Sequence, residues 1–263
     1  MPIYKTQLFP KTRIATIDVC EIGMQKHHIP AFIEIDITES RKKIKKYKSK
    51  VGRISFTAWL IKVISLTVKD HPQVAAFHKE KRKVVIFNDI NVSMAVEKTV
   101  DGRKVPIPLV IEKAHERSIE SITKQINEAI EKTMTDKDIV LHARAKRLEL
   151  LYYHLPGFLR RSFWRYLLKH PRLAYKKMGN VAVTAVGMMG NINGWFIPVS
   201  VHPVCFGIGR ITKKPVVVDD KTEIREMLNM TILLDHDVID GAPMVRFVSD
   251  LSANIEKGLG LVV

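Results

Sequence analysis

The sequence predicts a single α/β domain, a two-layer sandwich in which helices flank a mixed β-sheet over residues 1–263. A chain of 263 residues that is 46% hydrophobic can bury a full-sized core. Short β-branched runs bounded by turn residues share the chain with longer apolar stretches at helical spacing. Two cysteines, Cys20 and Cys205, are too few for a disulfide scaffold, so a reducing, cytoplasmic setting is expected.

The first predicted elements are a strand at residues 33–37 and a helix at residues 55–68. The strand alternates apolar and acidic residues at a period of two, as a half-exposed strand does. The second stretch is too long and too apolar for one strand. Either Ser55 or Thr57 can cap it, which favours a buried helix.

Three further strands are predicted at residues 84–87, 90–96 and 105–111. The first two flank Asn88 and Asp89, which predicts a turn between them. Another turn is expected at residues 101–102, an Asp-Gly pair, before the third strand. Two prolines restrict where that third strand can pair, because proline lacks a backbone N–H.

The second half of the chain predicts a helix, three strands and a closing helix, at residues 118–134, 181–186, 204–208, 230–234 and 242–256. Ser118 begins the first helix through an imperfect capping box, and isoleucines follow at helical spacing. Residues 178–209 contain no charged residue, but repeated glycines and prolines would break a membrane-spanning helix. Buried strands joined by turns are therefore the better interpretation.

The net charge of +16 is concentrated in two segments. Residues 41–53 carry eight basic residues and no acidic one, and residues 142–178 carry ten basic residues with Glu149 as their only acid. Together they account for the whole net charge, so the rest of the chain is nearly neutral. A localised positive field attracts phosphates, acidic cofactors, nucleic acid or anionic lipid, and does not choose among them.

The second of these segments also holds seven of the chain's nineteen aromatic residues and predicts two short amphipathic helices. Three interpretations remain open: a helical pair packed on its own domain, an anchor for an anionic membrane or a lid, and a contact with a partner protein. The anchor hypothesis assigns insertion to Phe163 and Trp164, and headgroup contacts to Arg160, Arg161 and Arg165.

The sharpest motif is Asp-His-Asp-Val-Ile-Asp-Gly at residues 235–241, between an apolar strand and the closing helix. His236 can present its imidazole to a channel while Asp240 fixes the local backbone and Gly241 permits a tight return. From the spacing alone, a histidine beside an apolar strand is more often structural than catalytic.

This motif resembles the His-x-x-x-Asp-Gly signature of the catalytic domain of the dihydrolipoyl acyltransferases of 2-oxoacid dehydrogenase complexes, which are related to chloramphenicol acetyltransferase. Other tracts resemble the same family in the same order, at residues 29–32, 56–72, 95–106 and 181–190. The resemblance implies a chloramphenicol acetyltransferase-like fold. It makes residues 1–263 one acyltransferase catalytic domain, with a basic aromatic helical insert at 142–178.

The resemblance implies a coenzyme A-dependent acyl transfer to a thiol or hydroxyl acceptor, with coenzyme A or acyl-CoA as substrate. His236 would act as general base, Thr184 would donate to the oxyanion, and Asp240 would hold the loop that carries His236. A base is needed because a thiol of pKa about 8.5 is mostly protonated at neutral pH, so forming the thiolate costs roughly 2 kcal/mol. The family assembly implies a homotrimer or a multiple of trimers, with His236 facing Thr184 of a neighbouring copy.

The sequence departs from the family pattern at three places. Asp237 stands where the family usually has arginine, and the stretch at residues 196–203 is shorter than its counterpart. We expect no lipoyl domain or peripheral-subunit-binding domain, because no tract before the core resembles either one. We therefore expect no covalently attached lipoate, and a substrate that is either carried by another protein or is a free small-molecule acceptor.

Two rival functions come from other classes: a catalytically silent oligomeric scaffold, and a basic module that binds anionic membrane or nucleic acid. The joint presence of His236 and Thr184 favours the enzyme, and nucleic acid is the less favoured partner. No metal is expected, because the pairs His27–His28 and His202–Cys205 lack further ligands at metal-binding spacing.

Overall fold

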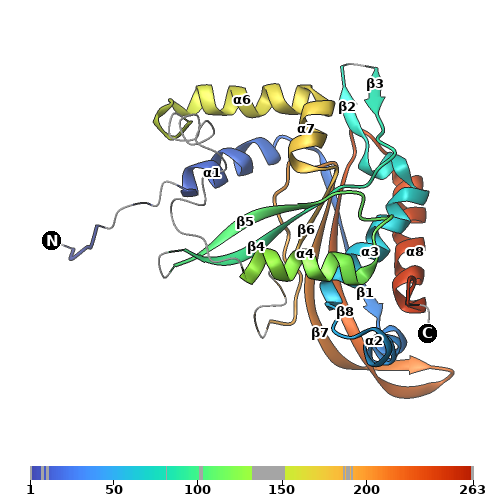
Figure 1. Ribbon diagram of the computed structural model, residues 1–263. Helices are drawn as coiled ribbons and strands as arrows, with labels where there is room; N and C mark the ends of the chain where they lie inside the picture. Colours follow the sequence, from blue (N-terminus) through green and yellow to red (C-terminus); the bar gives the residue numbers. More distant parts are fainter. Residues whose placement is uncertain are drawn as a thin grey trace.

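The computed structural model describes residues 2–6, 9, 12–80, 82–100, 103–131, 152–185, 187, 190 and 192–261. Its centre is a six-stranded mixed sheet in the order β1-β8-β7-β6-β4-β5 (Figure 1). The strands are β1 (His28–Asp36), β4 (Val92–Val100), β5 (Arg103–Ile111), β6 (Val181–Thr184), β7 (Val204–Val218) and β8 (Lys221–Asp235). Strand β6 runs parallel to both neighbours and the other pairs are antiparallel, which confirms the predicted mixed sheet.

Helices pack on this sheet and around it. They are α1 (Thr12–Gly23), α2 (Thr38–Val51), α3 (Phe56–Asp70), the 3-10 turn η1 (Pro72–Ala75), α4 (Ile119–Glu131), α6 (Gly157–Lys169), α7 (Pro171–Met178) and α8 (Gly241–Lys257). Side chains of α2, α3, α4 and α8 join one hydrophobic cluster with alternate residues of the strands. Trp59, Phe206 and Phe247 are its largest fully buried members. These four helices therefore cover a single face of the sheet.

The helices predicted from apolar spacing form where expected. Ser55 is the N-cap residue of α3, and nine side chains of that helix are buried. At the start of α4, the Ser118 hydroxyl accepts a hydrogen bond from the Ser121 N–H at 3.2 Å. The closing helix predicted at residues 242–256 forms as α8, which is one residue longer at each end. Apolar spacing and burial agree in all three helices, which is why the sequence was sufficient, although the Ser55 side chain makes no capping hydrogen bond.

The strands predicted at residues 84–87 and 90–96 both form, as β3 and β4, but they belong to different sheets. Strand β3 (Lys83–Val85) pairs instead with β2 (Phe77–Lys79) in a separate two-stranded ribbon, while β4 belongs to the main sheet. The cause is Phe87, whose ring stacks on Tyr175 of α7 with 4.0 Å between ring centroids. This contact draws the connection toward α7, so the two strands do not fold back on each other.

The strands predicted at residues 204–208 and 230–234 are the inner parts of a much longer ribbon. Strands β7 and β8 have 15 residues each and meet at Asp219 and Asp220, both with positive φ, as a tight two-residue hairpin turn requires. The outer half of the ribbon projects beyond the helices (Figure 1). Its apolar residues, such as Val217 and Ile224, are exposed, so a pattern based on burial did not find it.

Strand β5 forms one edge of the sheet and carries Pro106 and Pro108. The register pairs Val100 of β4 with Arg103 of β5, which matches the predicted turn, although residues 101–102 lie outside the described part. Edge positions tolerate proline because one side of the strand makes no ladder hydrogen bonds.

Helix α1 was not predicted, and a polar contact holds it in place. The fully buried carboxylate of Asp18 accepts hydrogen bonds from Arg160 Nε at 2.6 Å and from the Tyr152 hydroxyl at 2.7 Å. Helix α6 lies on the outer side of α1, away from the sheet (Figure 1). The two helices predicted for the basic aromatic segment are confirmed as α6 and α7, while residues 142–151 lie outside the described part.

Within the described ranges, no single helix is both long and apolar enough to cross a membrane. Helices α2 and α3 meet that length and composition only together, as a pair bent by 110°.

Candidate active site

His236 directly follows the last residue of β8, and its backbone is tied to β1. The His236 N–H donates to the carbonyl oxygen of His27 at 3.0 Å, which continues the β1–β8 ladder by one residue. The side chain of His236 is exposed, so its imidazole is open to a substrate or to another chain. A fixed backbone with an open side chain is what a general base requires.

A buried carboxylate holds the turn that follows His236. Asp235 is 1% exposed, forms an ion pair with Lys26, and accepts a hydrogen bond from the Asp237 N–H at 3.3 Å. The Val238 N–H donates to the Asp235 carbonyl at 3.2 Å. Asp235 therefore supports the loop from both its side chain and its main chain, a role that the sequence analysis had given to Asp240.

Asp240 occupies the N-cap position of α8 and its side chain is exposed. Its carbonyl accepts the first helical hydrogen bond, from the Met244 N–H at 3.1 Å, but its carboxylate makes no capping hydrogen bond. A negative charge here is favourable toward the helix N-terminus. Its role in holding the His236 loop stays a prediction.

Asp237, the residue that departs from the family pattern, lies against His27. Their side chains meet at 2.8 Å between Asp237 Oδ1 and His27 Nδ1. The hydrogen bond and the negative charge of Asp237 raise the pKa of His27 above its usual value. Both side chains are exposed, so water screens this pair more than it screens Lys26 and Asp235.

Thr184 is the last residue of β6 and lies on the sheet face opposite the helices. Val181 and Val183 point into the core, so strand alternation places Ala182 and Thr184 on the other face. The register continues across the sheet from Thr184 to Gly207 of β7 and then to Thr231 of β8. Thr184 is half-buried on that face.

One chain does not bring His236 and Thr184 together. Thr184 is level with Thr231, which lies five residues before His236 along β8. At about 3.3 Å per residue that is roughly 16 Å along the strand, in addition to two strand spacings of about 4.8 Å. A tetrahedral intermediate needs both groups within about 3 Å of its atoms. The two side chains of one chain therefore cannot act on the same acyl group.

Two polar residues on β8 were missed by the sequence analysis. Asn229 and Thr231 are buried on the same sheet face as Thr184, and Asn229 Oδ1 and Thr231 Oγ1 have no hydrogen-bond partner among the described residues. The Asn229 amide donates to Asn193 Oδ1 at 3.2 Å. The signal was present as polar residues at alternate positions of an otherwise apolar strand, Leu-Asn-Met-Thr-Ile.

The histidine pairs that could have suggested a metal instead make structural hydrogen bonds. His28 Nε2 donates to the His202 carbonyl, and His202 Nε2 donates to the Met178 carbonyl, both at 2.9 Å. Burial lowers the pKa of His202 to about 4, so its ring is neutral at physiological pH. Burial raises the pKa of the Cys205 thiol to about 12, which makes it a poor nucleophile.

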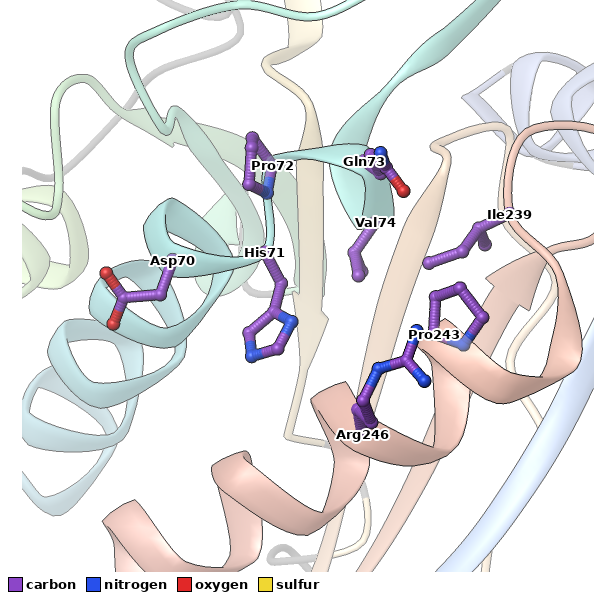
Figure 2. A pocket seen from close by; sticks show the side chains of 8 residues that line it. All are labelled: Asp70, His71, Pro72, Gln73, Val74, Ile239, Pro243 and Arg246. Atoms are coloured by element: carbon purple, nitrogen blue, oxygen red, sulfur yellow. The ribbon is translucent and has the colours of Figure 1, made fainter.

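A separate pocket of about 220 Å³ lies between the ends of α3 and η1 and the start of α8 (Figure 2). Its lining is Asp70, His71, Pro72, Gln73, Val74, Ile239, Pro243 and Arg246. The imidazole of His71 bonds Asp250 of α8 at 2.8 Å, which joins the two helices. Neither His236 nor Thr184 lines this pocket, so we do not place the acyl-transfer chemistry in it.

Among the described residues, Asp89, His115 and Glu116 are close enough to share a metal ion. The ammonium of Lys113 already lies 3.4 Å from Asp89 and 3.9 Å from Glu116. That cation lies near both carboxylates, so the cluster already forms an ion-pair network.

The sequence model of the 2-oxoacid dehydrogenases acyltransferase catalytic domain matches residues 18–139 and 171–263. The match therefore includes the strands that carry His236 and Thr184. It does not include residues 140–170, which contain α6.

Curated relatives share about a quarter of their residues with the chain. The dihydrolipoyllysine-residue acetyltransferase component of the pyruvate dehydrogenase complex of Mycoplasma pneumoniae is 27% identical over 258 residues, which is 93% of this chain and 54% of that protein. The component of the same name from Staphylococcus epidermidis is 27% identical over 223 residues, 82% of this chain and 42% of that protein. The chain thus spans about half the length of these relatives.

Solved structures share the fold. A probable dihydrolipoamide acetyltransferase of Listeria monocytogenes superimposes with a TM-score of 0.70 at 20% identity, over 97% of this chain and 95% of that one. The cubic core of a pyruvate dehydrogenase multienzyme complex gives a TM-score of 0.67 at 15% identity, over 100% of this chain and 95% of that one. At identities this low, the superpositions establish a common architecture and no more than that.

Proposed function

Since the chain belongs to the acyltransferase catalytic-domain family of the 2-oxoacid dehydrogenases, we propose that it transfers an acyl group between coenzyme A and a thiol or hydroxyl acceptor. His236 is the general base and Thr184 is the oxyanion donor. The relatives are named for a dihydrolipoyllysine residue, so a dithiol of this kind is the first acceptor to test.

The observation that carries the proposal is the placement of His236 and Thr184. Each lies at the end of a strand, His236 exposed and Thr184 half-buried, at the distance derived above from the strand register. Such a separation is inconsistent with a site inside one chain. It is consistent with a site in which one chain supplies the histidine and another the threonine.

The proposed assembly is a homotrimer or a multiple of trimers, formed through the sheet face that carries Thr184. That face is covered in part by residues 192–199, whose Trp195 donates to the Ile33 carbonyl and whose ring contacts Phe32 edge-on. Phe32, Trp195, Phe196 and Ile197 are all exposed. An exposed apolar patch of neighbouring large side chains is typical of a subunit interface. The similarity to a cubic core agrees with repeated assembly.

The chemistry follows from these two groups. His236 removes the proton from the acceptor thiol, and the sulfur attacks the thioester carbonyl of acyl-CoA. The carbonyl oxygen becomes an oxyanion that accepts a hydrogen bond from the Thr184 hydroxyl of a neighbouring chain. When the carbon–sulfur bond to coenzyme A breaks, the leaving thiolate takes the proton back from His236. The reverse direction uses the same groups.

The test is complementation between two inactive variants. His236→Ala and Thr184→Ala proteins are dissociated, mixed and reassembled, and acyl transfer from acetyl-CoA to dihydrolipoamide is then measured. Hybrid assemblies contain interfaces with an intact histidine beside an intact threonine. We therefore expect the mixture to regain a substantial fraction of wild-type activity, while either variant alone, taken through the same steps, does not.

Two outcomes would contradict the proposal. A fully active monomer in sedimentation at the assay concentration would refute the shared site. No transfer by the wild-type assembly across a panel of acyl-CoA donors and thiol or hydroxyl acceptors would favour a silent scaffold.

A further inference from the structure

Helix α6 presents an unusually apolar side to solvent. Phe158, Phe163 and Tyr166 are each more than half exposed, and Leu159 is 42% exposed. Spacing of three, four and seven residues places Leu159, Phe163 and Tyr166 on one stripe of the helix. Isolated exposed apolar residues are common, but four large ones on one helix mark a binding surface.

The opposite side of α6 fixes the orientation of this stripe. Arg160 bonds the buried Asp18 of α1, and the Trp164 indole N–H donates to the Tyr152 hydroxyl at 3.0 Å. Leu167 is buried, in a small cluster with Phe77. The helix is thus held by its inner side. The outward direction of Phe163 is a consequence of that docking.

The docking also corrects the sequence-based assignment of the headgroup-binding and inserting residues. Arg160 and Arg161 are neutralised by Asp18 and by Glu21, the latter at 3.1 Å. Trp164 is only partly exposed and packs toward the domain. Any lipid contact on the outward side must therefore come from residues other than Arg160, Arg161 and Trp164.

The cations that remain available are all exposed and unpaired with described carboxylates. They are Arg165 and Lys169 on α6, and Arg172, Lys176 and Lys177 on α7. No acidic residue occurs between residues 152 and 178. An apolar stripe beside uncompensated positive charge is complementary to an anionic lipid surface. Aromatic and aliphatic side chains can insert between the headgroups and the acyl chains, and Lys and Arg side chains can bind the lipid phosphates.

Helix α2 provides an internal comparison. It carries a similar density of lysines, but Ile44 is buried and only Val51, its last residue, is an exposed aliphatic side chain. Charge of this kind alone suits any polyanion, including nucleic acid. The combination of charge with exposed rings occurs on α6, which lies in the stretch that the family model does not match.

We propose that the outward side of α6, assisted by the bases of α6 and α7, docks the protein on an anionic membrane. Insertion would be shallow, to a depth of about 5–10 Å, as for helices that lie in the interface plane. The inference goes beyond acyl transfer and does not depend on it. It assigns α6 to placing the enzyme at a lipid surface.

The first experiment measures co-sedimentation of the full chain with vesicles of phosphatidylglycerol and phosphatidylcholine, against phosphatidylcholine alone. The variant Leu159→Ser/Phe163→Ser should weaken binding to the anionic vesicles by about tenfold or more, since it removes two insertion side chains. The matched control is Val217→Ser/Ile224→Ser, which removes two exposed apolar side chains on the β7–β8 ribbon and should bind as wild type.

The second experiment separates the bases of α6 from those of α2. Arg165→Gln/Lys169→Gln should weaken binding about tenfold at low salt and flatten its salt dependence. Lys46→Gln/Lys50→Gln removes the same charge from α2, where both lysines are exposed, and should have a much smaller effect. Transfer between soluble substrates should be unchanged in all four variants.

Several results would overturn the membrane proposal. Wild-type protein that ignores anionic vesicles at low salt would do so, as would equal losses from the α2 and α6 charge variants. A smaller assembly of Leu159→Ser/Phe163→Ser in sedimentation would show instead that the stripe is a subunit contact. If the protein binds an oligonucleotide, and this binding depends on Arg165 and Lys169 but not on Leu159 and Phe163, the surface is instead a nucleic-acid site.

Discussion

The strand ends that carry His236 and Thr184 are supported in different ways. The β8 end is held by a buried charge, because Asp235 bonds Lys26 and the His236 backbone continues the ladder with β1. The β6 end is held by backbone pairing and by the buried side chains of Val181 and Val183, and Thr184 itself pairs with β7 only. No side-chain hydrogen bond from a described residue reaches Thr184.

This difference teaches how a site can be divided between copies of one chain. In the proposed mechanism His236 needs a defined approach direction for proton transfer, which a loop fastened within its own chain provides. The proposed role of Thr184 requires only that its hydroxyl face the substrate. We infer that the final alignment comes when a second copy packs on the sheet face that carries Thr184, and the following predictions test each support.

The largest effect is expected from His236→Ala. Loss of the general base should lower kcat by about 10³-fold or more with little change in the KM for acyl-CoA, because the base acts in the transition state. Steady-state release of free coenzyme A measures this. Activity equal to wild type would remove His236 from the mechanism, provided that sedimentation shows an intact assembly.

The next effect is expected from Thr184. Thr184→Ala should lower kcat about a hundredfold, since one oxyanion donor is lost, whereas Thr184→Ser should retain most of the activity because its hydroxyl is kept. The serine variant is the control for packing on β6. If serine and alanine lose the same activity, Thr184 is a strand residue without a role in the reaction.

Asp235→Asn probes the support of the His236 loop. It leaves the partly buried Lys26 without its partner, which should cost about 2 kcal/mol of unfolding free energy. Because His236 is then less well positioned, kcat should fall more than KM rises. Urea unfolding and kinetics measure the two effects, and Asp237→Asn, on the exposed neighbouring pair, is the milder control. If Asp237→Asn destabilises the protein more than Asp235→Asn does, then Asp237 and not Asp235 is the main support of the loop.

The smallest effect concerns His27 and Asp237. Asp237 raises the pKa of His27 above 6.5. The pair therefore contributes its full stabilisation of the folded protein at pH values below the pKa that His27 has in the unfolded chain. The contribution disappears as pH rises through the folded pKa. His27→Gln should therefore lower Tm slightly at about pH 5.5 and leave it unchanged at about pH 9. A pH-independent difference would mean that the two side chains do not interact in solution.

Sequence patterns predicted the parts of the fold in which burial and local signals coincide. Helix α3 is long, apolar and preceded by Ser55, so its existence and start could both be deduced. Strand β1 alternates because one of its faces packs against the core. The motif around His236 and the position of Thr184 came from a resemblance that spacing alone did not provide.

The elements that escaped prediction depend on contacts between distant parts of the chain. Helix α1 is held by Asp18 and Arg160, which are 142 positions apart, and the Lys26–Asp235 ion pair joins residues 209 positions apart. The separation of β3 and β4 into different sheets has the same origin, since Phe87 stacks on Tyr175, which is 88 positions away. Sequence periodicity contains no information about such pairs.

The two prolines of β5 have a consequence for how copies of this chain can join. Pro106 and Pro108 are two residues apart on an edge strand, so both belong to the same set of alternate positions. In a strand paired on one side only, proline is tolerated where the missing N–H would point outward. The outer edge therefore lacks two donors that an added strand would need. Addition of a strand at this edge is therefore disfavoured, so the β1 edge and the faces of the sheet remain for contacts between copies.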